Sequence, residues 1–332
     1  MQTNNIRNEI SNFLSELVAD VKLESEFFLA SILNLTCRFH FGRNIPHLDL
    51  IKTAFLRSDL EDCDIEIFIS TDTDLFTFKT TKFQELVKSL HPSTNRFDNF
   101  RFSADPSGNF LYFYDVVNKI GGVWLSPNLS TFPEMLITPF RALISWIIES
   151  EGAVVLHASS FTLGEHNIIL SGPSGSGKST IAFEALARSE MVICDDALAL
   201  TSTHCFPIYT KMKLKSLTDS ISVAGKKLQC EQVGSKSVLN LTSVVGFQPR
   251  GYHPDYLLFP SMALNSNFLD LSKSDAIKKV VTDSFSETLG SPLGALKLIK
   301  SALSNVNTLD WQLEPDPTKN WEELRALVGN NA

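Results

Sequence analysis

Residues 172–180 read Gly172-Pro173-Ser174-Gly175-Ser176-Gly177-Lys178-Ser179-Thr180, and the stretch up to Ser179 matches the pattern G-x-x-x-x-G-K-[ST]. Glycines in such a loop let successive backbone N–H groups turn toward one anion, because no Cβ stands in the way. An apolar strand precedes the stretch, and apolar periodicity predicts a helix over 180–188. The sequence therefore predicts a phosphate-binding loop (P-loop), and a glycine-rich turn that matches by chance is the alternative.

The end of the P-loop carries residues that suit a nucleotide and a metal ion. The predicted helix directs the positive end of its dipole at a bound phosphate. Lys178 supplies a mobile positive charge for the β- and γ-phosphates, and the Ser179 hydroxyl is a ligand for Mg²⁺. We therefore predict that residues 172–180 bind ATP and that Ser179 contacts Mg²⁺.

Two adjacent carboxylates, Asp195 and Asp196, end an apolar run one predicted helix after the P-loop. Such neighbours repel each other unless a cation or a substrate proton lies between them. Successive strand residues point to opposite sides, so the two carboxylates are predicted to have different roles. An aspartate at a strand end that merely forms a turn or a cap is the alternative.

A histidine, His157, lies in the apolar run 154–162, and a short turn joins this run to a second one at 166–170. We predict that the two runs form a hairpin directly before the P-loop. Pairing within the hairpin brings His157 near the carboxylate pair, which favours a catalytic role. A histidine in an apolar run is commonly a core residue, and that interpretation is the alternative.

Basic residues gather after the carboxylate pair. Between Thr210 and Arg250 they outnumber the two acidic residues, Asp219 and Glu231. A solvated lysine face and a surface for a phosphate or an acidic substrate are both open interpretations. The basic residues are Lys211, Lys213, Lys215, Lys226, Lys227, Lys236 and Arg250.

The composition excludes several classes of protein. The formal net charge is −8, which argues against general binding to nucleic acid or to an anionic membrane. The apolar runs are far shorter than the ~20 residues that a membrane span needs. The five cysteines form no Cys-x-x-Cys pair, which argues against a disulfide scaffold and a structural zinc site. We therefore expect a cytoplasmic protein that binds neither nucleic acid nor membrane.

Strand-like runs dominate the first part of the chain, whereas strands and helices are mixed in the second. The first part shows a helical pattern at 5–19 and strand patterns at 33–41, 64–70, 97–104, 109–116 and 119–125, with a hairpin turn at 105–108. The second part shows helical patterns at 139–150, 275–285, 292–304 and 318–328, and strand patterns at 191–200 and 308–313. We predict a β-rich domain over 1–135 and a P-loop domain over 136–332.

Three segments taken together resemble the catalytic domain of the HPr serine kinase family. They are Leu156-His157-Ala158, the P-loop, and Cys194-Asp195-Asp196, all within residues 135–215. That family has the phosphoenolpyruvate carboxykinase fold, so the resemblance implies an α/β (α+β) domain with a mixed sheet. It also implies a kinase that moves the γ-phosphoryl group of ATP to a serine-type hydroxyl.

The resemblance also implies roles for the matched residues. His157, Lys178, Asp195 and Asp196 would be catalytic, and Asp195 would share the Mg²⁺ ion with Ser179. Asp196 would remove the proton of the acceptor hydroxyl, while His157 would tune or orient Asp196.

One signature of the HPr kinases, Glu-x-Arg-Gly-x-Gly, is not found after the aspartate pair. We therefore expect the acceptor to be a peptide, another protein or a small hydroxylated molecule rather than HPr. Two other classes stay open, namely a P-loop metabolite kinase of the nucleotide-kinase type and an ATP-binding regulatory protein without transfer activity. The predicted hairpin argues against a nucleotide kinase, because consecutive parallel strands would need a crossover. A homo-oligomer and a monomer are both compatible with the sequence.

Overall fold

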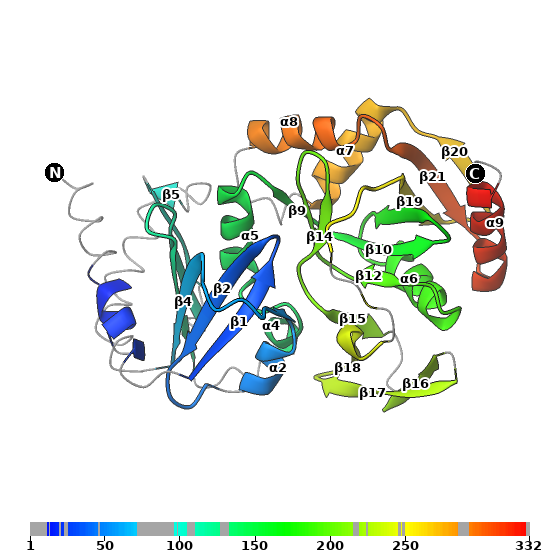
Figure 1. Ribbon diagram of the computed structural model, residues 1–332. Helices are drawn as coiled ribbons and strands as arrows, with labels where there is room; N and C mark the ends of the chain where they lie inside the picture. Colours follow the sequence, from blue (N-terminus) through cyan, green and yellow to red (C-terminus); the bar gives the residue numbers. More distant parts are fainter. Residues whose placement is uncertain are drawn as a thin grey trace. The chain divides into compact units, whose positions relative to one another are not determined.

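The computed structural model divides the chain into two compact units, Met1–Ser150 and Glu151–Ala332 (Figure 1). The residues it describes are 12, 14–19, 21–22, 26–45, 47–71, 96–97, 99–104, 110–126, 133–214, 219–223, 225–244, 247, 250–284 and 292–329. The fold class is mixed α and β in the second unit and largely β in the first, as predicted.

The first unit is built on an eight-stranded sheet with the order β3-β1-β2-β4-β8-β7-β6-β5. Neighbouring strands are antiparallel except for the parallel pairs β2–β4 and β4–β8. Aromatic side chains such as Phe39, Phe68 and Phe113 are fully buried in its core. The strands are β1 (Glu26–Ile32), β2 (Leu35–Phe41), β3 (Leu56–Arg57), β4 (Ile65–Ser70), β5 (Arg96–Phe97), β6 (Phe100–Ala104), β7 (Phe110–Asp115) and β8 (Ile120–Leu125).

Most elements expected in the first unit are confirmed, and β1 is an addition. The predicted hairpin is the antiparallel pair β6–β7, although its turn at 105–108 lies outside the described residues. Of the helix predicted over 5–19, residues 14–19 are helical, and the residues before 12 lie outside the described part. The unit also contains the short helices α2 (Leu48–Lys52) and α4 (Pro133–Ile137) and the longer helix α5 (Arg141–Ser150).

Helix α5 belongs to the first unit, whereas the predicted boundary at 135 placed it in the second. The helix contacts β7, and the Tyr114 hydroxyl lies 3.2 Å from Ser150 Oγ at its end. Its apolar residues are buried there, including Leu143 and Trp146. Because this packing is set by tertiary contacts, the helical pattern alone did not show which unit the helix joins.

The second unit is built on a six-stranded mixed sheet with the order β12-β10-β11-β19-β21-β20. Strands β11, β19 and β21 run parallel, and the other pairs are antiparallel. The strands of this sheet are β10 (Ala158–Leu163), β11 (His166–Ser171), β12 (Val192–Cys194), β19 (Tyr256–Met262), β20 (Asn267–Asp270) and β21 (Asn307–Leu313).

Two smaller sheets complete this unit. One has the order β14-β13-β9, and the other has the order β15-β18-β17-β16. The first contains β9 (Val154–Leu156), β13 (Leu198–Leu200) and β14 (Cys205–Pro207). The second contains β15 (Lys211–Leu214), β16 (Ser220–Val223), β17 (Lys226–Val233) and β18 (Lys236–Asn240), and a 3-10 turn, Leu241–Ser243, follows it.

Helices cover both faces of the six-stranded sheet (Figure 1). Leu170 of β11 packs with the core that includes α6 and α9, whereas the next residue back, Ile169, packs with the core that includes α7 and α8. This alternation is what a strand buried on both faces requires. The helices are α6 (Lys178–Ala187), α7 (Lys273–Ser284), α8 (Pro292–Ala302) and α9 (Pro317–Gly329).

The predicted hairpin before the P-loop is confirmed as the antiparallel pair β10–β11, but the first expected strand, 154–162, is broken. It divides at His157 into β9 and β10, which belong to different sheets. The expected strand 191–200 also divides, because β12 ends at Cys194 and β13 begins at Leu198. The two breaks lie opposite each other, since β10 pairs with β12 and β9 pairs with β13.

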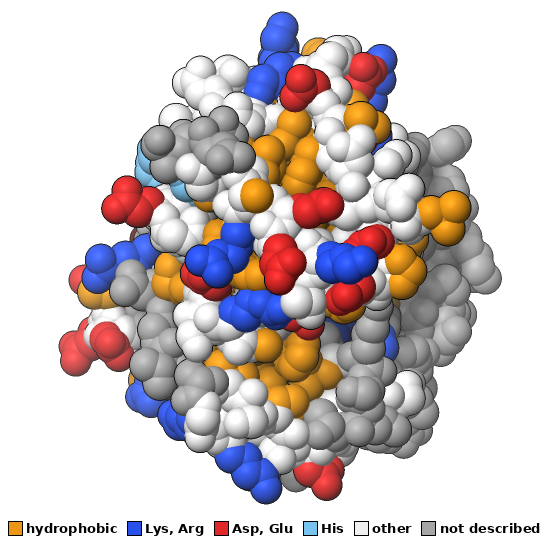
Figure 2. All heavy atoms as spheres, turned by 90° about the vertical axis from the view of Figure 1, so that its right-hand side faces the viewer, with side chains coloured by type: hydrophobic (Ala, Val, Ile, Leu, Met, Phe, Trp, Pro, Cys, Tyr) orange, Lys and Arg blue, Asp and Glu red, His pale blue; other side chains and the backbone are white. Residues whose placement is uncertain are grey.

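None of the helices among the described residues combines the length and the apolar character that crossing a membrane requires. On the face of the molecule in Figure 2, basic and acidic side chains are interspersed rather than gathered in one basic patch.

Candidate functional site

The P-loop has the strand-loop-helix setting that its sequence predicts. Strand β11 ends at Ser171 and α6 begins at Lys178, slightly before the predicted start. Gly175 has φ +84° and Gly177 has φ +108°, a backbone region that residues with a Cβ rarely adopt. At Gly177 an added Cβ would also lie 2.6 Å from Leu313 Cδ1. The glycines are therefore required by the shape of the loop.

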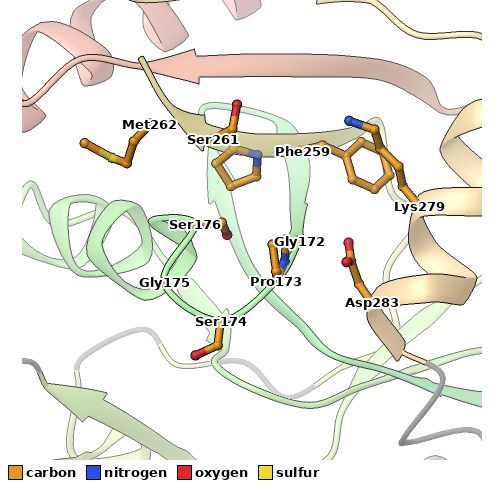
Figure 3. Close-up of a pocket in the computed structure, with 11 residues that line it drawn as sticks. Gly172, Pro173, Ser174, Gly175, Ser176, Phe259, Ser261, Met262, Lys279 and Asp283 are labelled. Atoms are coloured by element: carbon orange, nitrogen blue, oxygen red, sulfur yellow. The ribbon is translucent and has the colours of Figure 1, made fainter. Parts of the chain in front are cut away.

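A cavity of about 530 Å³ lies beside the P-loop (Figure 3). One wall is the loop itself, and the others are the end of β19 and the end of α7. Phe259 and Met262 give it an apolar side, whereas Asp283 brings a carboxylate whose pKa is raised by burial and held back by the nearby Lys178. The lining residues are Gly172, Pro173, Ser174, Gly175, Ser176, Phe259, Pro260, Ser261, Met262, Lys279 and Asp283.

Lys178 is buried, with 6% of its surface exposed, rather than being an exposed loop lysine. Its ammonium donates to the carbonyl oxygens of Gly172 at 2.5 Å and Pro173 at 3.0 Å. Burial lowers the pKa of Lys178, and nearby carboxylates oppose that shift. Among the described residues, Ser176 Oγ and Thr180 Oγ1 are buried without a hydrogen-bond partner. A ligand rich in oxygen acceptors, such as a polyphosphate, fits these donors.

The first carboxylate, Asp195, contacts Ser179 at the start of the P-loop helix and is 1% exposed. Its Oδ1 accepts hydrogen bonds from Ser159 Oγ at 2.6 Å and Ser179 Oγ at 2.9 Å. Its Oδ2 accepts one from the backbone N–H of Lys213 at 3.2 Å. Burial raises the pKa of Asp195, and the hydrogen bonds from Ser159 and Ser179 oppose that shift. A buried carboxylate of this kind is stabilised by a nearby cation.

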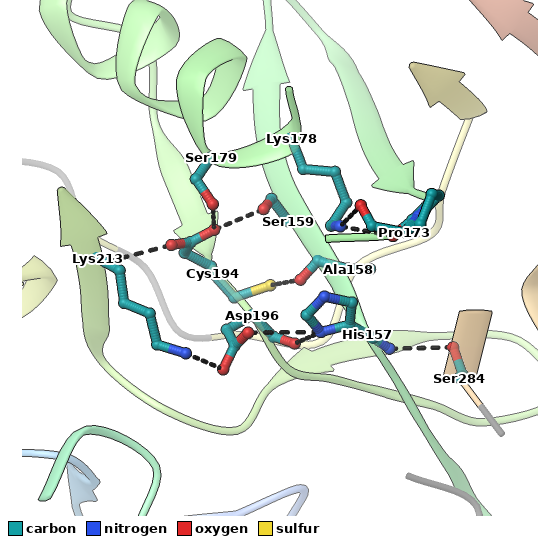
Figure 4. A network of polar contacts seen from close by, with 12 residues as sticks. His157, Ala158, Ser159, Pro173, Lys178, Ser179, Cys194, Asp196, Lys213 and Ser284 are labelled. Atoms are coloured by element: carbon teal, nitrogen blue, oxygen red, sulfur yellow. Dashed lines mark hydrogen bonds and ion pairs between the residues drawn. The ribbon is translucent and has the colours of Figure 1, made fainter. Parts of the chain in front are cut away.

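The second carboxylate, Asp196, faces away from the P-loop helix (Figure 4). Its Oδ1 lies 3.4 Å from His157 Nδ1, and its Oδ2 accepts a hydrogen bond from Lys213 Nζ at 2.9 Å. His157 is fixed in turn, because its ring Nδ1 lies 3.1 Å from the carbonyl oxygen of Asp196 and its backbone N–H donates to Ser284 Oγ at 3.0 Å. The φ of Asp196 is +79°, so the chain cannot continue as a strand there. The left-handed turn gives the neighbouring carboxylates different partners.

The structure therefore brings His157, Lys178, Ser179 and the two aspartates into one region of the second unit. Sequence reasoning missed Ser159, although its position two residues after His157 in the apolar run was a signal for it.

The oxygen ligands near the P-loop fit Mg²⁺. Mg²⁺ takes one or two protein carboxylates together with substrate phosphates and water, rather than a cage of protein ligands. Ser179 Oγ and Asp195 Oδ1 lie 2.9 Å apart, which allows both to reach one ion after small side-chain rotations. The described residues contain no group of three or more His, Cys, Asp and Glu side chains around a point, and such a site needs none.

The structure corrects the interpretation as a solvated face for the first two lysines of the basic stretch. Lys211 is 1% exposed and its ammonium lies 3.0 Å from Glu231 Oε2. Lys213 contacts Asp196, and Lys215 lies outside the described residues. The reason is that Met212 and Leu214 of β15 pack in the core that includes α6, so the two lysines lie on the opposite face of the strand. Each of them meets a carboxylate there. The exposed lysines of β17 fit a solvated face.

No protein-family model matches this sequence, and no curated protein matches it. Among solved structures, the chain is similar to the HPr(Ser) kinase/phosphatase from Coxiella burnetii, with 10% sequence identity and a TM-score of 0.29. The match covers 53% of this chain and 95% of that chain. A likeness at this TM-score defines neither fold nor function, so both rest on the sheets, helices and site described above.

Proposed function

We propose that the second unit is an ATP- and Mg²⁺-dependent kinase that transfers the γ-phosphoryl group to a serine-type hydroxyl of a peptide, a protein or a small molecule. The observation that supports it most is that the two neighbouring carboxylates have different partners. Asp195 is bonded to Ser179 of the P-loop, whereas Asp196 lies beside His157 on the other side of the chain. One carboxylate thus suits the phosphates and the metal, and the other suits the acceptor.

Nucleotide binding would use the P-loop and the adjoining cavity. The loop N–H groups and the start of α6 hold the phosphates, and Lys178 exchanges its two carbonyl partners for phosphate oxygens. The nucleoside lies along Phe259 and Met262 in the cavity. Mg²⁺, held by Ser179 and Asp195, supplies charge neutralisation at the phosphates.

Transfer would use the groups around Asp196. The acceptor hydroxyl gives its proton to Asp196, which His157 orients from 3.4 Å. The hydroxyl oxygen then bonds to the γ-phosphorus, and the bond between that phosphorus and the bridging oxygen of the β-phosphate breaks. Such chemistry depends mainly on positioning and charge stabilisation, which this small set of groups can provide.

An acceptor screen with γ-labelled ATP tests the proposal. The full chain is incubated with peptides, free serine, nucleoside monophosphates and fractionated cell lysate, each with Mg²⁺ and with EDTA. We expect label in a hydroxyl acceptor only when Mg²⁺ is present. Label in a nucleotide would indicate a nucleotide kinase, and nucleotide binding without transfer to any acceptor would indicate a regulatory protein.

Replacing Asp195 with Asn should stabilise the ligand-free protein while weakening its use of Mg²⁺. Burial raises the pKa of this carboxyl, so its charged form opposes folding at neutral pH, and a neutral amide removes that cost. The amide can donate to Ser159 and Ser179 and accept from Lys213 N–H. The melting temperature should rise by roughly 2–4 °C for each kcal/mol gained. The Mg²⁺ concentration for half-maximal activity should also rise, and excess Mg²⁺ should partly restore activity.

Thermal melts without ligand and Mg²⁺ titrations of activity measure both effects. Ser159→Ala is the matched control, because it keeps the buried charge and removes one of its donors. That variant should lose about 1–3 kcal/mol of stability. A lower melting temperature for Asp195→Asn together with an unchanged Mg²⁺ requirement would contradict the prediction.

A further inference from the structure

Lys213 is connected to both carboxylates of the site (Figure 4). Its backbone N–H donates to Asp195 Oδ2 at 3.2 Å, and its ammonium donates to Asp196 Oδ2 at 2.9 Å. The residue lies in β15, which belongs to the four-stranded sheet rather than to the sheet that carries the P-loop. A third segment of the chain therefore reaches the carboxylate pair with a positive charge.

The direction of this side chain is fixed by the strand. Met212 and Leu214, on either side of Lys213, are 0% and 9% exposed and pack in the core that includes α6. Because successive strand residues point to opposite faces, Lys213 must point away from that core. Its side chain remains 22% exposed, which leaves the ammonium within reach of an incoming substrate.

The distances of phosphoryl transfer place the reacting group beside this ammonium. A general base lies about 2.6–3.2 Å from the hydroxyl it deprotonates. The reacting oxygen and phosphorus lie about 3–3.5 Å apart before the bond forms. A γ-phosphoryl group aligned with an acceptor hydroxyl that is hydrogen-bonded to Asp196 is thus two short contacts away from that carboxylate. Lys213 already contacts the same carboxylate. A lysine, with three donors on a flexible stem, can change partners over such a distance.

Resting on the kinase function proposed above, we propose that Lys213 is a catalytic residue that donates hydrogen bonds to the transferred phosphoryl group. Before transfer its ammonium pairs with Asp196. During transfer the hydroxyl proton moves to Asp196, the hydroxyl oxygen bonds to the γ-phosphorus, and the electron pair of the broken bond stays on ADP. The ammonium turns to the equatorial oxygens of the moving group, where the negative charge is spread. Lys178 acts on the same group from the P-loop side.

A test that needs no acceptor compares two ligands of the full chain, MgADP and MgADP with fluoroaluminate, which imitates the phosphoryl group in transfer. We expect fluoroaluminate to tighten binding of MgADP to the original protein. Lys213→Gln should bind MgADP with unchanged affinity. The increase in affinity caused by fluoroaluminate should be about 10²–10³-fold smaller than in the original protein, as for the loss of one donor to developing charge. Lys213→Arg, which keeps the positive charge, should retain most of that increase.

Lys211→Gln is a matched control, because it removes one positive charge from the same strand. Lys211 pairs with Glu231, which lies outside the carboxylate pair. The Lys211→Gln change should lower the melting temperature and keep the fluoroaluminate effect. Lys227→Gln, on the exposed side of β17, controls for charge without a loss of stability. The inference is overturned if Lys213→Gln keeps the full fluoroaluminate effect, or if the original protein shows none. Failure of the original protein to bind MgADP would instead contradict the proposed kinase function.

Discussion

Replacing Lys178 with Met is expected to abolish nucleotide binding and phosphoryl transfer while leaving the protein folded. The side chain is buried, and methionine keeps most of its apolar stem while removing the ammonium. In the proposed function, that ammonium is the cation that the P-loop offers to the β- and γ-phosphates. The loss in kcat/KM should reach at least about 10²–10³, the usual effect of removing one preorganised donor to a developing charge. Calorimetric titration with MgATP and the labelled-ATP assay measure it.

Methionine is preferable to alanine because Lys178 is buried. Alanine would leave a void at the start of α6, and lost activity could then reflect lost stability. Lys278→Met is a suitable control, since that lysine is exposed on α7 and pairs only weakly with Asp275. Lys278→Met should have the same melting temperature and the same affinity for MgATP as the original protein. Retained transfer by Lys178→Met would show that the P-loop does not act on a nucleotide in this protein.

The core of the site could be predicted because its signals are local in sequence. The P-loop residues have a characteristic spacing, its glycines are required by the backbone conformation of the loop, and a short turn joins the strands of the hairpin before it. Each of these needs only neighbouring residues, and the structure shows the strand-loop-helix and the antiparallel pair β10–β11.

Features that depend on tertiary pairing could not be predicted. The runs around His157 and around Asp196 are apolar on both sides, so each looks like one continuous strand. Their division between two sheets follows from the pairing of β9 with β13 and of β10 with β12, which sequence periodicity does not encode. The same limit applies to Lys213, because only the pairing of β15 with β18 shows that this lysine leaves the basic face and meets Asp196.

Strand β1 was missed for a related reason. Its residues, Glu26–Ile32, include a continuous apolar run without clear alternation, and their exposure ranges from open to buried. Such a run fits a strand or a helix equally well when it is short. The strand becomes evident only from its antiparallel pairing with β2.

The second large effect is expected from replacing Asp196 with Asn. A serine-type hydroxyl is a poor nucleophile, and a positioned general base typically contributes about 10²–10⁴ in rate. The amide keeps the size of the side chain and can still accept a hydrogen bond from Lys213, but it cannot take up the proton. We therefore expect kcat to fall by about 10²–10⁴ while the affinity for MgATP changes little. The carboxylate oxygens of Asp196 contact His157 and Lys213, and its charge acts on Lys178 less than those of Asp195 and Asp283 do.

Asp195→Asn is the matched comparison, because it makes the same chemical change one residue away on the P-loop side. Nucleotide affinity and kcat of both variants are measured across a Mg²⁺ titration. Excess Mg²⁺ should partly restore Asp195→Asn and should leave Asp196→Asn inactive, since the missing function there is a proton acceptor. If Mg²⁺ restores Asp196→Asn instead, the two carboxylates have the opposite roles. If neither change slows transfer, the carboxylate pair is not the reaction centre, and the division of contacts around Asp195 and Asp196 has only a structural purpose.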